Sequence, residues 1–138
     1  ENHFITKERT VAFDFGEAMK NIYATKESTE IIEYSDGEVH IASNSFGEGR
    51  SVYIAGLPYS QANTRLLLRS LFYAAKKETE LKKWYANNIY CEVHAYPEAK
   101  KYAVVNNSNK PQTTKVYNGE GNSRTVNLAP CEIVWEAI

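Results

Sequence analysis

The sequence predicts an α+β protein, in which the end of an α/β domain is followed by a small antiparallel β-sandwich domain. Residues 47–73 indicate the first part, because a glycine turn, an apolar strand, a proline-marked loop and an amphipathic helix follow in that order. After residue 88 the pattern changes to short β-like runs. One strand–helix unit is too little to cover a parallel sheet. We therefore expect a larger protein to contain this chain, with domains at 1–85 and 86–138.

The predicted first domain begins with short elements. Residues 10–15 alternate apolar and polar side chains, which predicts a strand, and residues 18–23 suit a helical turn or a second short strand. Residues 30–34 and 38–42 flank Ser35-Asp36-Gly37. Asp-Gly between two β-rich runs predicts a hairpin, because Gly tolerates the positive φ of such turns.

The strand–helix unit follows. Residues 46–50 are predicted to form a turn, and the apolar run 51–57 a strand buried on both faces. Pro58 ends the strand, and Ser60 is the predicted N-cap of a helix that runs to about Ala75. The apolar stripe of this helix is predicted to consist of Thr64, Leu67, Leu68, Leu71, Phe72 and Ala75. The side chains predicted to point outward are Arg65, Arg69 and Lys76. A short second helix is expected at 78–85, anchored by Leu81, Trp84 and Tyr85.

The second domain is predicted from five short β-like runs separated by turn residues. These runs are 89–96, 101–106, 112–117, 123–128 and 131–136. Strands at spacings of about 8–12 residues are typical of a small antiparallel sandwich or barrel.

Composition limits the classes of function. The 138 residues carry a net charge of −1 and are 43% apolar, as in a globular protein. This balance argues against a nucleic-acid or anionic-membrane surface, and no apolar run approaches a membrane span. Cys91 and Cys131 are too few for a disulfide framework. A disulfide bond between Cys91 and Cys131 is geometrically possible. We expect the protein to be cytoplasmic and both cysteines to be free thiols, because cytosolic thiols stay reduced.

Motifs for chemistry are sparse. Gly47 and Gly49 precede a strand and lack the third glycine of a dinucleotide fingerprint, so they predict a turn. Cys91 and His94 lie three residues apart, which places them on opposite faces of a strand and argues against a metal site. His3 and His40 complete the histidines, and no zinc spacing joins the three. No G-x-S-x-G elbow supports a serine nucleophile.

Two carboxylates and one sequon are further candidates for function. Asp14 and Glu17 follow a candidate strand, where α/β enzymes place functional groups, but a solvated Asp and an early helix Glu explain them more simply. Asn106-Asn107-Ser108 matches a glycosylation sequon and is expected to be a turn. The sequence therefore predicts no catalytic, cofactor-binding or metal-binding residue.

Aromatic side chains supply the one binding hypothesis. With Trp84, the strand aromatics could form a sugar-stacking surface, although core and cross-strand pairs are the commoner role for such residues. These strand aromatics are Tyr90, Tyr96, Tyr102, Tyr117 and Trp135.

Long stretches of the chain carry a family resemblance. Residues 49–75 (GRSVYIAGLPYSQANTRLLLRSLFYAA), 94–121 (HAYPEAKKYAVVNNSNKPQTTKVYNGEG) and 128–138 (LAPCEIVWEAI) resemble the C-terminal part of the 1,3-β-galactosyl-N-acetylhexosamine phosphorylases. These are the lacto-N-biose/galacto-N-biose phosphorylases of glycoside hydrolase family 112. Residues 11–24 and 30–50 are similar to the same family.

The resemblance implies a three-part parent enzyme: a catalytic TIM-type barrel, a middle glutamine amidotransferase-like α/β domain and a small C-terminal β domain. It implies inverting phosphorolysis of β-1,3-galactosides to galactose 1-phosphate, without an organic cofactor. The acid and the main sugar contacts would lie in the barrel, so the resemblance assigns no catalytic residue to this chain. Without its missing strands, the predicted helix would expose Leu67, Leu71 and Phe72 unless something covers them.

Three roles follow as hypotheses. The first is a non-catalytic support for the rest of the parent enzyme, which would use phosphate and galactosides. The second is a carbohydrate-binding module that uses the aromatics of the β domain. The third is an oligomerisation piece that pairs with a second copy.

Overall fold

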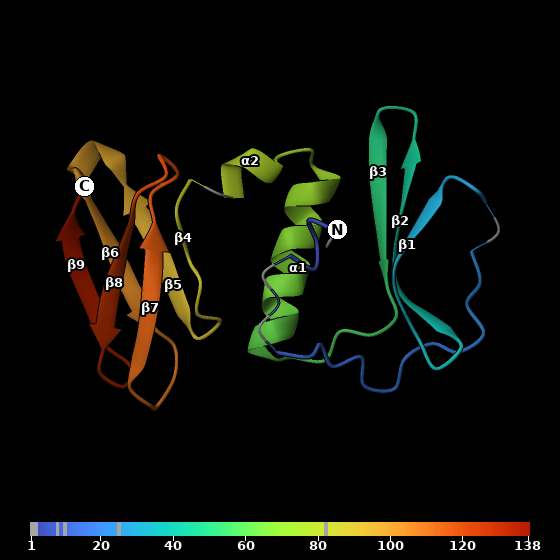
Figure 1. The fold of residues 1–138 in the computed structure, drawn as a ribbon, viewed down its shortest axis with the longest axis horizontal. Coiled ribbons are helices and arrows are strands. Elements are labelled where there is room, and N and C mark those ends of the chain that lie inside the picture. Colours follow the sequence, from blue (N-terminus) through green and yellow to red (C-terminus); the bar gives the residue numbers. More distant parts are fainter. Residues whose placement is uncertain (1–2, 8, 10, 25, 82) are drawn as a thin grey trace. The chain divides into compact units, whose positions relative to one another are not determined.

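The structure is a computed structural model that describes residues 3–7, 9, 11–24, 26–81 and 83–138. The chain divides into two compact units, Glu1–Glu78 and Thr79–Ile138. Each unit has its own hydrophobic core. The helices and strands of both are labelled in Figure 1.

The first unit is built on a three-stranded antiparallel sheet in the order β1-β2-β3. The strands are β1 (Thr29–Ser35), β2 (Glu38–Phe46) and β3 (Gly49–Ile54). Asp36 and Gly37 both have positive φ, at 54° and 81°, which is the type I′ geometry of a two-residue hairpin. The predicted hairpin is confirmed, with longer strands than the sequence indicated.

The predicted burial of the strand at 51–57 on both faces is wrong for this chain. β3 ends at Ile54, and its residues alternate between exposed and half-buried positions before Val52. It pairs with β2 in antiparallel register, Phe46 opposite Gly49. The two-residue turn at 47–48 is the physical reason, because such a short loop joins only antiparallel strands.

Residues 11–15 and 18–23 form neither a strand nor a helix, so both predictions for this stretch are wrong. The alternation at 11–15 has another cause, since Phe13 and Phe15 pack on the core residues Ile5, Ile41 and Leu66. Gly16 and Asn21, with φ of 53° and 60°, interrupt any regular backbone there. Residue 10 lies outside the described residues.

Helix α1 (Gln61–Ala74) begins where the sequence predicts. The Ser60 hydroxyl accepts a hydrogen bond from the Asn63 backbone N–H at 3.1 Å, which confirms the N-cap. The helix packs against β3.

The buried face of α1 is not the predicted one. Its buried residues are Ala62, Asn63, Leu66, Arg69 and Ser70, whereas Leu67, Leu68 and Leu71 are 41%, 43% and 58% exposed. Arg69, predicted to point outward, lies over the Phe4 ring and donates to the Phe4 carbonyl at 2.7 Å. Three of these five buried residues are polar, so the spacing of apolar residues does not identify the buried face. Exposure of Leu67 and Leu71 is confirmed, while Phe72 is half-buried.

The predicted helix at 78–85 is correct only in its first half. Helix α2 spans Glu78–Leu81, and Tyr85–Ala86 forms strand β4. Tyr85 of β4 pairs with Tyr117 of a neighbouring strand, so its backbone is extended rather than helical.

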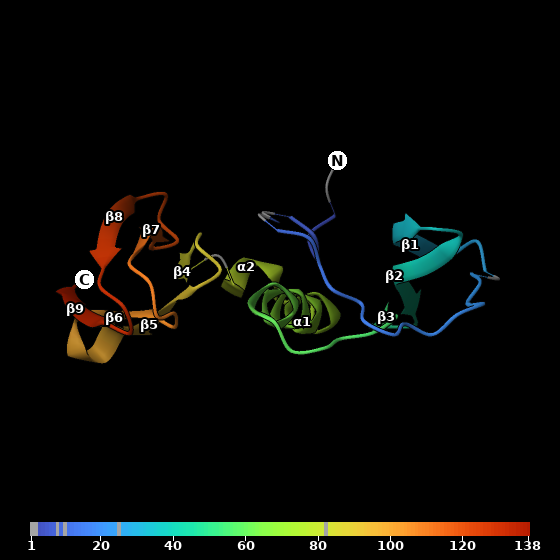
Figure 2. The ribbon, with the colours of Figure 1, turned by 90° about the horizontal axis from the view of Figure 1, so that it is seen from below.

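The second unit is a small antiparallel β domain, as predicted. One sheet has the order β4-β7-β8, with β7 at Gln112–Tyr117 and β8 at Ser123–Leu128. The other has the order β5-β6-β9, with β5 at Cys91–Tyr96, β6 at Lys101–Asn106 and β9 at Ile133–Ala137. A 3-10 turn, η1 (Pro97–Ala99), links β5 to β6. Figure 2 shows the two sheets as facing layers.

Both sheets contribute to the core of the second unit. Its buried members are Ala86, Cys91, Tyr102, Val104, Val116, Val126 and Leu128. Cys91 is buried and Cys131 exposed, and both are thiols, as expected. Asn106 is also buried, and its side chain bonds the Lys110 and Ala129 carbonyls at 2.8 Å each. The sequon asparagine is therefore a structural residue.

Candidate functional site

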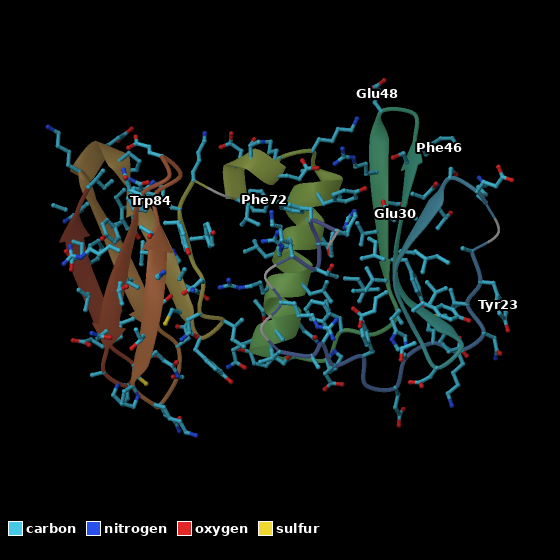
Figure 3. The ribbon with its side chains drawn as sticks, viewed as in Figure 1. Tyr23, Glu30, Phe46, Glu48, Phe72 and Trp84 are labelled. Carbon is cyan, nitrogen blue, oxygen red and sulfur yellow. The ribbon has the colours of Figure 1, made fainter. Side chains whose placement is uncertain are left out.

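A pocket opens at one end of the two-sheet domain and is the strongest candidate for a binding site. Its volume is about 200 Å³. The lining residues come from both sheets and from the turn between β7 and β8: Trp84, Tyr102, Val116, Asn118, Asn122, Ser123, Arg124, Ala137 and Ile138. Figure 3 labels Trp84, just before β4.

Aromatic rings form the apolar wall of the pocket. The rings of Trp84 and Tyr102 lie with centroids 5.0 Å apart and planes tilted by 38°. Tyr102 is buried in the core, while Trp84 packs against that core and is only half-buried. An indole held by a buried ring gives the pocket a rigid wall.

An ion pair joins the two sheets beside this wall. Arg124 stands opposite Val116 in the first sheet, and Glu136 opposite Tyr102 in the second. Both side chains therefore lean into the space between the sheets, where Arg124 Nη1 and Glu136 Oε2 are 2.5 Å apart. The Arg124 side chain is 59% exposed, so the contribution of the pair to stability is small.

The turn at 118–122 forms the polar rim. The Asn118 side-chain oxygen accepts the Glu120 backbone N–H at 3.0 Å, and the Asn118 backbone N–H donates to the Asn122 carbonyl at 3.3 Å. Gly119 has φ of +80°, and a Cβ on it would lie 2.4 Å from Lys83 Cα. Only glycine allows this close approach, which holds the segment before Trp84 against the rim.

This combination of an aromatic wall, amide side chains and a guanidinium suits a neutral, hydroxyl-rich ligand better than it suits catalysis. Among the residues that the structure describes, no three His, Cys, Asp or Glu side chains gather as metal ligands. Neither described helix is long and apolar enough to cross a membrane.

The strand aromatics do not form one surface. Tyr102 is core, and Tyr117 stacks on Tyr85 at 4.6 Å with planes only 7° apart, a cross-strand pair. Tyr96 and Trp135 lie 5.6 Å apart and are 47% and 55% exposed. Tyr90 is 37% exposed.

The histidines and candidate carboxylates are dispersed. His40 lies against Phe15 at 4.4 Å, and His94 contacts Glu92 at 3.1 Å on the surface of β5. The Asp14 carboxylate accepts the Gly16 backbone N–H at 2.8 Å, and Glu17 is exposed outside any helix. The structure does not bring Asp14 and Glu17 together with a histidine.

An ionic cluster in the first unit was missed by the sequence analysis. Arg50 pairs with Glu78, donates to the Tyr73 carbonyl at 3.1 Å and lies 4.5 Å over the Tyr73 ring. The pKa of Glu78 is lowered by a hydrogen bond from the Glu78 backbone N–H to the carboxylate, and Arg50 lowers this pKa further. Burial lowers the pKa of nearby His3, opposed by Glu30 at 3.6 Å. These contacts fasten β3 to the end of α1, and a lone Arg at a strand start gives no sequence signal.

Asn63 is the other residue that the sequence analysis missed. Its side chain is only 1% exposed and binds the Asp14 backbone N–H and carbonyl, at 3.1 and 2.6 Å, and the Pro58 carbonyl at 2.7 Å. It lay within a predicted helix, where nothing distinguishes it from a solvated amide. Both missed groups hold the fold together.

Two family models match the chain. The lacto-N-biose phosphorylase central domain matches residues 1–79, and the lacto-N-biose phosphorylase C-terminal domain matches residues 84–136.

Individual relatives extend this result. The chain is 49% identical, over its whole length and 19% of the relative, to a 1,3-β-galactosyl-N-acetylhexosamine phosphorylase of Lachnoclostridium phytofermentans. It is 43% identical to one from Bifidobacterium longum, over 88% of the chain and 16% of the relative. A D-galactosyl-β-1→4-L-rhamnose phosphorylase of L. phytofermentans is 33% identical, over 80% of the chain and 16% of the relative. The chain spans less than a fifth of the length of these curated relatives.

Proposed function

This chain belongs to the lacto-N-biose phosphorylase family, and we propose that it is a non-catalytic support within a galactosyl-N-acetylhexosamine phosphorylase. Residues 1–85 would form the tail of the middle α/β domain and residues 86–138 the C-terminal β domain. The whole enzyme would use phosphate to split β-1,3-galactosyl-N-acetylhexosamine into galactose 1-phosphate and the free hexosamine. The substrates named for the relatives support this reaction.

The exposed leucine face of α1 is the observation that carries the proposal. Leu67, Leu68 and Leu71 keep 41–58% of their surface in contact with solvent, on the face opposite Leu66. Covering such side chains contributes about 1 kcal/mol each. A helix with apolar residues on two faces is typical of a position between layers. The rest of the middle domain would supply the second layer.

Three carboxylates of the chain are engaged in structural contacts. Inverting cleavage of a glycosidic bond needs a carboxylic acid at the leaving oxygen and, here, a site for the attacking phosphate. Glu78 pairs with Arg50, Glu136 with Arg124, and Asp14 bonds the backbone of its own turn. These pairs belong to scaffolding rather than to an acid facing a phosphate site.

The purified 138-residue chain tests this proposal. Incubated with lacto-N-biose and phosphate, it is expected to release no galactose 1-phosphate, while the full-length protein that contains it releases product under the same conditions. Release by the chain alone would contradict a non-catalytic role. The solution mass of the chain, measured over a range of concentrations, tests the alternative of an oligomerisation piece.

Sugar binding in the pocket is the second candidate function. The half-buried Trp84 ring beside Asn118 and Asn122 has the chemistry of a galactoside subsite, in which an aromatic face meets amide groups. Titration with galactose and lacto-N-biose, followed by tryptophan fluorescence, tests it. The Trp135→Phe variant, with Trp84 as its only tryptophan, should keep the signal, and Trp84→Phe should lose it. The absence of a spectral shift with either sugar would contradict sugar binding in this pocket.

A further inference from the structure

Strand β9 exposes most of its apolar side chains on the face that points away from the other sheet. Val134 packs on the core, and Glu136 points between the sheets toward Arg124. The alternate residues Ile133, Trp135 and Ala137 therefore point away from the core. Ile133 is 56% exposed and Trp135 is 55% exposed. A strand with one solvated face normally shows the opposite pattern.

The apolar surface continues from β9 onto β6 and, at Tyr96, onto β5. Ile133 stands opposite Val105, Trp135 opposite Ala103, and Lys101 lies between Ala137 and Tyr96. Ala103 is only 3% exposed although it faces outward, flanked in register by His94 and Trp135. We call this surface the outer face and define it by six residues: Tyr96, Ala103, Val105, Ile133, Trp135 and Ala137.

Charged groups surround this apolar centre. Lys101 Nζ lies 5.1 Å from the centre of the Trp135 ring. At the β5 side, His94 Nε2 and Glu92 Oε2 are 3.1 Å apart and both side chains are about half exposed. An apolar centre with a polar rim is the composition of a protein–protein interface.

The chemistry of the outer face favours a protein partner over a sugar. Ile133, Val105 and Ala137 are aliphatic and offer no ring for a sugar to stack on. The Lys101 ammonium occupies space over the Trp135 ring. Six side chains are also few for a free dimer, which needs about 800 Å² per partner. A partner in the same polypeptide needs less area, because the tether replaces the entropy cost of association.

We propose that the outer face docks onto the preceding part of the same polypeptide, the part that would carry the catalytic barrel. The matched relatives are roughly five times as long as this chain and hold the equivalent residues in one polypeptide with the rest. This inference rests on the proposed function, in which most of the enzyme precedes the chain. The outer face would then fix the β domain against that part, and α1 would serve the middle domain separately.

Thiol labelling tests the docking. The Ile133→Cys variant is made on a Cys131→Ser background, both in the full-length protein and in the 138-residue chain. Thr125→Cys is the matched control, because Thr125 is also exposed on an edge strand but belongs to the other sheet. Maleimide labelling of each site is followed by peptide mass spectrometry, after circular dichroism has shown a folded protein.

Docking predicts that Ile133→Cys reacts at least tenfold more slowly in the full-length protein than in the isolated chain, while Thr125→Cys reacts equally in both. Equal rates for Ile133→Cys in both proteins would overturn it, as would equal protection of the two sites. Protection in the isolated chain that grows with concentration would identify a second copy, and protection by added lacto-N-biose a sugar.

A second variant distinguishes loss of docking from loss of the fold of the β domain. Trp135→Arg should lower the melting temperature of the full-length protein and leave that of the isolated chain within about 2 °C. An equal loss in both proteins would assign Trp135 a role inside the β domain and contradict docking. Labelling reports docking whether or not the protein cleaves galactosides, and product release from the same samples tests the proposed function separately.

Discussion

Removal of the Asn63 amide is expected to lower the stability of the first unit much more than a substitution at the neighbouring helix residue Thr64. Asn63 is 1% exposed, and its side-chain nitrogen donates to the Asp14 and Pro58 carbonyls at 2.6 and 2.7 Å. Its side-chain oxygen accepts the Asp14 backbone N–H at 3.1 Å. The one amide therefore ties the irregular segment at 11–16 and the loop before α1 to the helix.

The expected loss for Asn63→Ala follows from these three bonds. Each contributes about 0.5–1.5 kcal/mol net, and the partly buried backbone groups left without a partner add to the loss, so the total is about 3–5 kcal/mol. A domain of this size is stable by about 5–15 kcal/mol, so the change removes a large share. Thr64→Ala is the matched control, because it alters the next helix residue, loses one exposed bond to the Ser60 carbonyl and should cost under about 1 kcal/mol.

Urea unfolding of the 138-residue chain measures this difference. Both tryptophans, Trp84 and Trp135, belong to the second unit, so fluorescence follows that unit. Circular dichroism at 222 nm follows α1, and its midpoint should fall in Asn63→Ala while the fluorescence midpoint stays constant. If Asn63→Ala costs no more than Thr64→Ala, the tethering role of the amide is wrong.

Three further predictions concern a turn, acid stability and the exposed helix face. Gly119→Ala should destabilise the second unit by about 2–4 kcal/mol, because its φ of +80° and a Cβ 2.4 Å from a backbone atom both oppose a side chain. Gly121→Ala, with φ of +89° and open space, should cost only about 1 kcal/mol by the same fluorescence assay. The first unit should lose stability as pH falls, first below the ordinary histidine value of 6.5 and then below 4.5, because the pKa values of His3 and Glu78 are both lowered in the folded state. Thermal melts between pH 7 and 4 measure this, and a melting temperature of His3→Gln that falls as steeply as wild type between pH 7 and 5 would exclude His3. Leu71→Glu should leave the isolated chain as stable as wild type, since Leu71 is 58% exposed, and should destabilise the full-length protein by about 2 kcal/mol. Equal melting temperatures for the full-length pair would show that this face is not covered.

Most strands of the second unit could be predicted from local signals. Strands β6, β7 and β8 have the predicted bounds, because each ends at an Asn-, Gly- or Pro-rich turn, whereas β5 and β9 begin two residues later than predicted. β4 was missed because two residues carry no periodicity. Tyr85 and Trp84 were assigned to a helix, since the preceding Glu78–Leu81 does form one.

The first unit was harder because its decisive contacts are distant in sequence. The segment at 11–15 has the apolar alternation of a strand, yet its backbone partner is the side chain of Asn63, 49 residues away. The buried face of α1 depended on Arg69 reaching Phe4, 65 residues away. The apolar pattern of the helix could not reveal a buried face on which Asn63, Arg69 and Ser70 are polar.

The candidate pocket could not be predicted from any motif. Its residues come from both sheets and from one turn, and Trp84 and Arg124 lie 40 positions apart. The sequence raised sugar stacking only as a hypothesis for Trp84 and the strand aromatics, beside their commoner role in core and cross-strand pairs. Only the register of β8 and β9 places Arg124 and Glu136 in the space between the sheets.

The central claim, that this chain supports the enzyme without performing its chemistry, is tested most directly by kcat in the full-length protein. Asp14, Glu17 and His94 are among the residues that the sequence raises as candidates for chemistry, and each is replaced by Ala. Loss of a general acid or base lowers the rate by about 10²–10⁴-fold. We predict that kcat for galactose 1-phosphate formation stays within twofold of wild type in all three variants. A hundredfold loss of kcat in any one, at an unchanged melting temperature, would contradict the account.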